Sequence, residues 1–131
     1  MPKKTNGIKL LKYADTFLSF NASETIFKEG EDGKQMFVVK SGVAELHVAG
    51  VVIETLEAGD IVGEMALLDN HCRSATAIAL TDCQLVPIDS ERFEYLIRQT
   101  PNFAIEVMQV MAERLRRMNR QTQVIGRKAE S

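Results

Sequence analysis

The sequence predicts a mainly β domain flanked by helices, and three observations support this fold class. Between Glu24 and Ile88, short β-rich runs alternate with turn signals about every 8–12 residues, which is typical of a roll, barrel or sandwich. On either side of this region the apolar residues change to helical spacing. The chain has 131 residues, 45% of them hydrophobic, which is enough to bury the core of one domain without disulfides or metal.

Six strands are predicted inside the β-rich region. Glycines occupy the turns between them, because glycine reaches positive φ angles without a Cβ clash. The structural role of glycine in turns is therefore predicted for Gly30, Gly33, Gly42 and Gly59, and by themselves these residues give no indication of a ligand. The predicted strands are Thr25–Phe27, Met36–Lys40, Val43–Val48, Val51–Leu56, Ala75–Ala79 and Gln84–Ile88.

Helices are predicted at both ends of the chain. Residues 8–20 have near-helical apolar spacing. Ser90 is a predicted N-cap, and the helix that follows should end at Thr100-Pro101, because proline disfavours the helical conformation of the residue before it. A second helix should run from about residue 102 to 121. The single domain thus comprises a helical segment (1–22), a β-roll (23–89), C-terminal helices (90–121) and a polar tail (122–131).

The last predicted helix carries two apolar strips. Ala104, Met108, Met111, Leu115 and Met118 recur at a 4-3-4-3 spacing, like a coiled-coil seam. A second strip, formed by Phe103, Val107 and Val110, lies beside it. One strip should pack on the roll, and we interpret the other first as a homodimer interface through helix 102–121, with plain packing or a ligand lid as alternatives. The arginines of this helix, Arg114, Arg116, Arg117 and Arg120, are predicted to form a solvated face.

The bulk composition argues against several classes of function. The net charge of −2 gives no global electrostatic case for binding nucleic acid. Cys72 and Cys83 form no C-x-x-C pair and predict neither a metal site nor a redox motif, and two lone thiols are typical of a cytoplasmic protein. No stretch approaches the roughly 18 apolar residues of a membrane-spanning helix. No base–nucleophile pair stands at a plausible spacing, so we predict no enzyme and no cofactor.

The segment from Gly59 to Ala79 is the one that indicates a ligand. Gly63 permits a tight bend, and the helix-forming run that begins at Glu64 would present free N–H groups to an anion. Arg73 follows beside small residues, and an arginine fork next to free amides suits a phosphate. The carboxylate of Glu64 would repel a phosphate and should face hydroxyl groups instead. The segment therefore predicts a ligand with a phosphate and a sugar hydroxyl close together, unless Glu64 and Arg73 pair with each other or lie in solvent.

Two stretches of this segment resemble a known family. Gly-Glu-Met-Ala-Leu-Leu from Gly63, followed by Arg-Ser-Ala-Thr from Arg73, looks like the phosphate-binding cassette of cyclic-nucleotide-binding domains. That family includes bacterial cAMP receptor proteins, protein kinase A regulatory subunits and cyclic-nucleotide-gated channels. The resemblance covers roughly residues 12–120. It implies an eight-stranded antiparallel β-roll, jelly-roll-like, with an N-terminal helix, two C-terminal helices and the cassette at residues 63–76.

The resemblance also implies a role for each matched residue. Glu64 should bind the ribose 2′-hydroxyl with the help of the Gly63 backbone, and Arg73 should pair with the exocyclic phosphate oxygens. The amides of Met65, Ala66 and Ser74 should add phosphate donors. The expected ligand-binding residues are Gly63, Glu64, Met65, Ala66, Arg73 and Ser74, with Val62, where many relatives have phenylalanine, and Val48 on the strand expected to contact the base.

The function implied by the resemblance is a regulatory sensor for a cyclic nucleotide, either cAMP or cGMP. Binding should be relayed through the C-terminal helices to an effector protein that the sequence does not identify. About ten residues follow Gln121, too few for a helix-turn-helix, so DNA binding by that route is not expected. The alternative is a structural or dimerisation domain of the same fold that binds no nucleotide.

Overall fold

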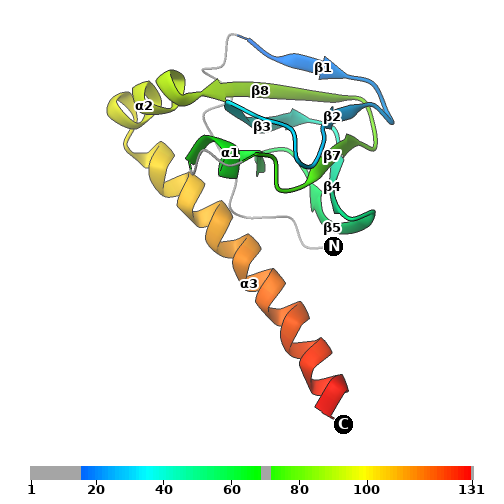
Figure 1. Ribbon diagram of the computed structural model, residues 1–131. Coiled ribbons are helices and arrows are strands. Elements are labelled where there is room, and N and C mark those ends of the chain that lie inside the picture. The colour runs from blue at the N-terminus through cyan, green and yellow to red at the C-terminus, as the bar shows by residue number, and fades with distance from the viewer. Residues whose placement is uncertain (1–15, 69–71, 131) are drawn as a thin grey trace.

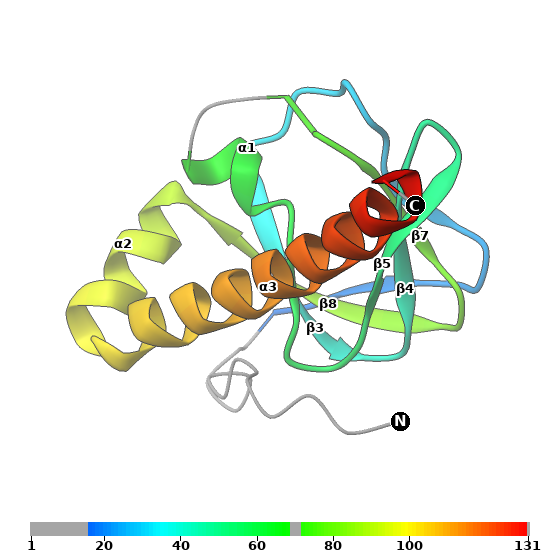
Figure 2. The ribbon, with the colours of Figure 1, turned by 90° about the horizontal axis from the view of Figure 1, so that it is seen from below.

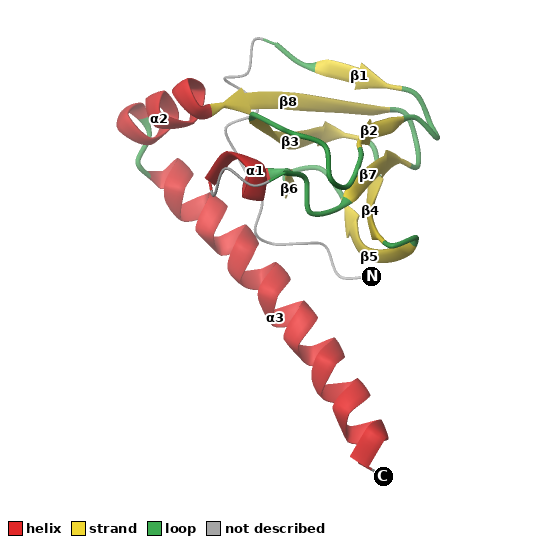
Figure 3. Cartoon of the chain, viewed as in Figure 1, coloured by secondary structure: helices red, strands yellow, loops and turns green. Residues whose placement is uncertain are grey.

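The computed structural model describes residues 16–68 and 72–130, with side chains as far as residue 120, and it is mainly antiparallel β (Figures 1 and 3). Two four-stranded sheets, with strand orders β1-β8-β3-β6 and β2-β7-β4-β5, form the roll. The predicted fold class is confirmed. The strands are β1 (Leu18–Phe20), β2 (Thr25–Phe27), β3 (Gln35–Ser41), β4 (Ala44–Val48), β5 (Val51–Leu56), β6 (Ile61–Val62), β7 (Thr76–Ala79) and β8 (Cys83–Asp89).

Three helices accompany the roll. The short helix α1 (Glu64–Leu68) directly follows β6, and α2 (Ser90–Gln99) follows β8. The long helix α3 (Asn102–Glu130) runs back from α2 across one side of the roll, and its last turns project beyond the strands (Figures 1 and 2). No helix in the described part of the chain is long and apolar enough to cross a membrane.

Strand β3 separates two apolar clusters, because successive side chains on a strand point to opposite faces. Phe37 and Val39 point into the roll, where they pack with residues of both sheets. Met36 and Val38 point to the other face and pack with α2 and α3. The strip of α3 that packs on the roll is the one predicted to do so, and its members Phe103, Val107 and Val110 are all buried.

The start of the described chain differs from its prediction. Residues 18–20 form strand β1 and not the end of a helix, so that part of the prediction is wrong, while residues 8–15 lie outside the described residues. Leu18 pairs with Leu85 and Phe20 with Cys83, and the Phe20 ring packs on the inner core cluster. Pairing with a strand far along the sequence thus overrides the helical spacing of this segment. The two-residue strand β6 was not predicted either.

Two helix ends also need correction. The N-cap of α2 is Asp89 and not Ser90, because the Asp89 carboxylate accepts a hydrogen bond from the Arg92 amide at 2.8 Å. The predicted break at Thr100-Pro101 is confirmed. Helix α3 does not end at residue 121 but continues to Glu130, so the predicted end of this helix is wrong. No proline follows residue 101, and most of these residues are adequate helix formers.

Candidate functional site

A cavity of about 490 Å³ lies between the cassette, the sheet that contains β4 and β5, and helix α3. Seven of the eight residues predicted to bind a ligand line it, all of them from the cassette region. The eighth, Val48, is half-buried against the core, while Leu46 and Ile53 line the cavity from the same sheet. The described lining residues are Phe27, Leu46, Ile53, Val62, Gly63, Glu64, Met65, Ala66, Arg73, Ser74, Ala75, Met111, Ala112, Arg114, Leu115 and Met118.

Arg73 is buried at the wall of this cavity, with 6% of its surface exposed. Its guanidinium donates a hydrogen bond from Nη1 to the Gly63 carbonyl at 3.1 Å and lies 4.3 Å from the centroid of the Phe27 ring. Its amide donates to the Glu31 carbonyl at 2.7 Å, which ties the cassette to the β2–β3 loop. Burial lowers the pKa of Arg73, while Glu31 and Glu64 oppose that shift. The cassette therefore holds a desolvated cation in place.

Two glycines make room for this guanidinium. A Cβ on Gly33 would overlap Nε and Cζ of Arg73, and a Cβ on Gly63 would overlap its Nη1. Gly63 also has a φ of +81°, which L side chains rarely adopt. The prediction that Gly33 serves only a turn is therefore incomplete, because its missing side chain also shapes the site around Arg73.

Glu64, the first residue of α1, is buried but does not pair directly with Arg73. Its Oε1 atom accepts a hydrogen bond from Nη1 of Arg114 at 2.9 Å, and Nη2 of Arg114 donates to the Ile61 carbonyl at 2.6 Å. The side chains of Arg114 and Glu64 are 12% and 10% exposed. The Arg114 guanidinium of helix α3 thus pairs with the Glu64 carboxylate, which was expected to bind a ribose hydroxyl. Sequence reasoning missed this contact.

A second ion pair joins α3 to the roll one helical turn further on. Nη2 of Arg117 lies 3.5 Å from a carboxylate oxygen of Glu54 on β5. The prediction of a fully solvated basic face is therefore wrong for Arg114 and Arg117. A signal was present in the sequence: Arg114 follows Met111 by three residues and precedes Met118 by four, so these side chains share one face of the helix.

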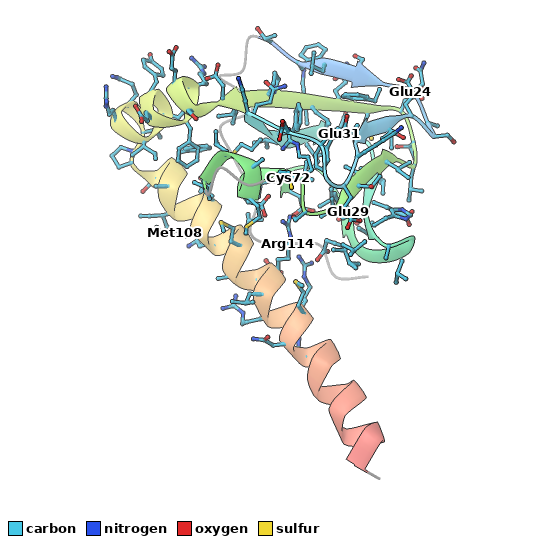
Figure 4. All side chains as sticks on the ribbon, in the orientation of Figure 1. Glu24, Glu29, Glu31, Cys72, Met108 and Arg114 are labelled. Carbon is cyan, nitrogen blue, oxygen red and sulfur yellow. The ribbon has the colours of Figure 1, made fainter. Side chains whose placement is uncertain are left out.

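The apolar seam of α3 is divided between the cavity and the surface. Met111, Leu115 and Met118 line the cavity. Met108 is 60% exposed and points away from the roll, whereas Arg114 points toward it (Figure 4). The second half of the seam therefore faces the cavity, while the first half leaves Met108 at the surface, and the dimer and lid interpretations stay predictions.

Comparison with known proteins agrees with this geometry. The model of the cyclic nucleotide-binding domain family matches residues 17–100. A cyclic AMP receptor protein from Thermus thermophilus is 36% identical over 96 residues, which are 70% of this chain and 44% of that protein. A cAMP-dependent protein kinase regulatory subunit from Emericella nidulans is 33% identical over 96 residues, which are 72% of this chain and 23% of that protein. The chain thus spans less than half the length of these relatives.

Solved structures show the same fold. The catabolite activator protein of Thermus thermophilus superposes with a TM-score of 0.73 at 30% identity, over 88% of this chain and 56% of that one. A second domain of a protein kinase A regulatory subunit, bound to the cAMP analogue Sp-2Cl-cAMPS, gives a TM-score of 0.63 at 33% identity, over 79% of this chain and 71% of that one. With a buried arginine and glutamate on one cavity wall and a family match over most of its length, the chain belongs to the cyclic nucleotide-binding domain family.

Proposed function

We propose that the chain binds a cyclic nucleotide, cAMP or cGMP, as a regulatory sensor and does no chemistry on it. One observation carries the proposal: the cassette brings buried Arg73 and buried Glu64 to the wall of one cavity of about 490 Å³. The family match supports nucleotide binding. Relatives named for cAMP and for cGMP match at similar identity, so both ligands remain in the proposal.

The two ends of the ligand would use different parts of the cassette. Arg73 offers a rigid fork of N–H donors in a desolvated position, where charge-assisted hydrogen bonds to phosphate oxygens are strong. The amides of Met65, Ala66 and Ser74 would add donors. Glu64 would accept a hydrogen bond from the ribose 2′-hydroxyl, which is neutral and so is not repelled by the carboxylate.

Nucleotide binding would be relayed through α3. In this structure Oε1 of Glu64 already accepts a hydrogen bond from Arg114. A ribose hydroxyl that binds this carboxylate must therefore share the carboxylate with Arg114 or displace Arg114 from it. Either event changes one of the two ion pairs that hold α3 on the roll. A ligand that favours one position of α3 shifts the population toward it. We propose that an effector protein, in the cytoplasm, reads this change.

A homodimer through helix 102–121 is part of the proposal. Met108 and Leu115 are 60% and 59% exposed, and both belong to the predicted seam. Sedimentation equilibrium of the intact chain, with and without nucleotide, measures its molecular mass. We expect a dimer that Met108→Asp weakens. A monomer under both conditions contradicts this part of the proposal and leaves nucleotide binding untouched.

Isothermal titration calorimetry of the intact chain with cAMP and with cGMP tests the main proposal. We expect saturable binding of at least one of them. The absence of binding by both at millimolar ligand contradicts the proposal.

The alternative function, a structural domain with an unused cavity, is favoured by one observation. The charged groups of the cavity already have partners inside the chain, Glu64 with Arg114 and Arg73 with the Gly63 carbonyl. Thermal unfolding separates the two functions, because a ligand that binds only the folded state raises stability by about 2.7 kcal/mol at 100 times its Kd. An unchanged Tm at millimolar cAMP and cGMP supports the structural domain.

A further inference from the structure

Phe27 lies under the guanidinium of Arg73 at the wall of the cavity. It is the last residue of β2, and 8% of its surface is exposed. Cζ of Arg73 lies over the Phe27 ring, 4.3 Å from its centroid. Because both side chains are buried, this is a desolvated cation–π contact, the setting in which such contacts are strongest.

The Phe27 ring is itself held by packing. It stacks on the Phe37 ring, with centroids 6.3 Å apart and ring planes at 19° to each other. Phe37 is buried, and both rings belong to the inner core cluster. Since close-packed neighbours fix its orientation, the Phe27 ring offers the guanidinium a flat surface that does not turn.

The ring contact holds Arg73 without using its donors. A carboxylate partner would accept the in-plane N–H groups of the guanidinium, whereas an aromatic ring attracts a cation through its face. Glu64, on the same cavity wall, pairs with Arg114 instead. Nη1 of Arg73 donates to the Gly63 carbonyl, but that bond alone leaves the guanidinium plane free to turn about it. The Phe27 ring therefore supplies the orientation that this hydrogen bond does not.

We propose that Phe27 is a positioning residue, whose ring fixes the plane of the Arg73 guanidinium so that its N–H groups face the phosphate of the nucleotide. The inference rests on the proposed function and deepens it, because it names the residue that prepares the phosphate contact. A bidentate contact requires the fork to face two phosphate oxygens at once. A site that adopts its binding-competent arrangement for only part of the time binds more weakly by that fraction. Without the ring, Arg73 keeps its charge but loses this fixed plane, and the affinity should fall.

Fluorinated phenylalanines at position 27 test this inference in the intact chain. Each added fluorine withdraws charge from the ring face and changes the shape of the ring little, so packing is kept while the cation–π contact weakens. Calorimetric titration with cAMP and cGMP measures Kd for the mono-, di- and trifluoro variants. We expect Kd to rise with each fluorine and to reach about threefold to 30-fold for the trifluoro variant, the range that a cation–π contact allows.

The same fluorine series at Phe103 is the matched control. Phe103 is equally buried, packs edge-on against Phe93, and is not among the described lining residues. Fluorination there should leave both Kd values unchanged. In a parent chain that binds nucleotide, a flat series at position 27 overturns the inference and leaves the proposed function standing. A parent chain that binds neither nucleotide overturns both.

The nucleotide-free chain gives a second readout, which needs no ligand. Protons above the face of an aromatic ring resonate upfield, so the Arg73 side-chain N–H resonance should move downfield in Phe27→Leu, a variant that keeps an apolar side chain in the core. Far-UV circular dichroism checks its fold, and its Kd should rise by about the same factor as that of the trifluoro variant. An Arg73 resonance that Phe27→Leu leaves in place overturns the inference, because the contact would then not form in solution.

Discussion

Two walls of the cavity, the cassette and helix α3, differ in chemistry and in the way each is held. The cassette wall, residues 62–75, carries Glu64 and Arg73, which are 7% and 6% exposed. The α3 wall consists of Met111, Ala112, Leu115 and Met118 with Arg114 among them, and Leu115 and Met118 are 59% and 45% exposed. The cassette wall thus holds its two charged side chains in buried positions, whereas the α3 wall is mostly apolar and two of its side chains lie half in solvent.

This difference indicates which wall can move. The cassette is held by main-chain hydrogen bonds, among them those that link Arg73 to Glu31 and to Gly30. Around the cavity, α3 is held to the roll by ion pairs from Arg114 and Arg117, while its buried apolar strip lies nearer its start. Side chains alone fix this half of the helix beside the cavity, whereas main-chain hydrogen bonds fix the cassette, so the second half of α3 should detach at a lower free-energy cost than the cassette. Four substitutions test this contrast.

The largest expected effect is on the cassette wall. Arg73→Ala should weaken nucleotide binding by at least about 100-fold, because it removes a desolvated fork of charged donors. Calorimetric titration measures the loss, and far-UV circular dichroism checks that the variant folds. Arg98→Ala is the control, since the Arg98 side chain is 77% exposed on α2. Undiminished binding by the Arg73 variant would contradict the role given to this residue.

The next largest effect is expected at Glu64, the other charged residue of the cassette wall. Glu64→Gln should weaken cAMP binding by about tenfold, because the charge-assisted hydrogen bond to the ribose becomes a neutral one. The same variant should discriminate cAMP from 2′-deoxy-cAMP less than the parent chain does. Glu91→Gln, exposed in the first turn of α2, is the control. Equal discrimination in parent and variant would show that Glu64 does not face the ribose.

A smaller effect is expected where the two walls meet. Arg114→Ala should lower the free energy of unfolding by about 1–2 kcal/mol, because it leaves the buried Glu64 carboxylate without its cation. Urea unfolding of the nucleotide-free chain measures this, with Arg116→Ala, exposed on the same helix, as control. In the double variant with Glu64→Gln, the loss of unfolding free energy should be smaller than the sum of the two single losses. Additive losses would mean that the pair does not form in solution.

The smallest effect should come from the second ion pair of α3. The side chains of Arg117 and Glu54 are 25% and 11% exposed, and the pair is longer, at 3.5 Å. Arg117→Ala should therefore cost at most about 1 kcal/mol of unfolding free energy, and raised salt should reduce that cost. The same unfolding experiment at low and high salt checks it. A loss of unfolding free energy larger than the loss caused by Arg114→Ala would mean that the Arg117–Glu54 pair stabilises the fold more than the Arg114–Glu64 pair.

The sequence by itself determined the cassette wall. Gly63, Glu64 and Arg73 lie within eleven consecutive residues, and the helical turn between them follows from local propensity. The strand runs and the break at Pro101 could be predicted for the same reason, since they depend on residue type and spacing over short distances.

Only the tertiary structure decided the α3 wall and the first strand. The pair of Arg114 with Glu64 joins residues 50 positions apart, and β1 owes its conformation to pairing with β8, with Leu18 opposite Leu85. The same helical face of α3 could have met solvent, a second subunit or the cavity. The apolar periodicity of the sequence would be the same in all three cases. Residue spacing defines which side chains share a face of the helix, but only tertiary packing decides what that face contacts.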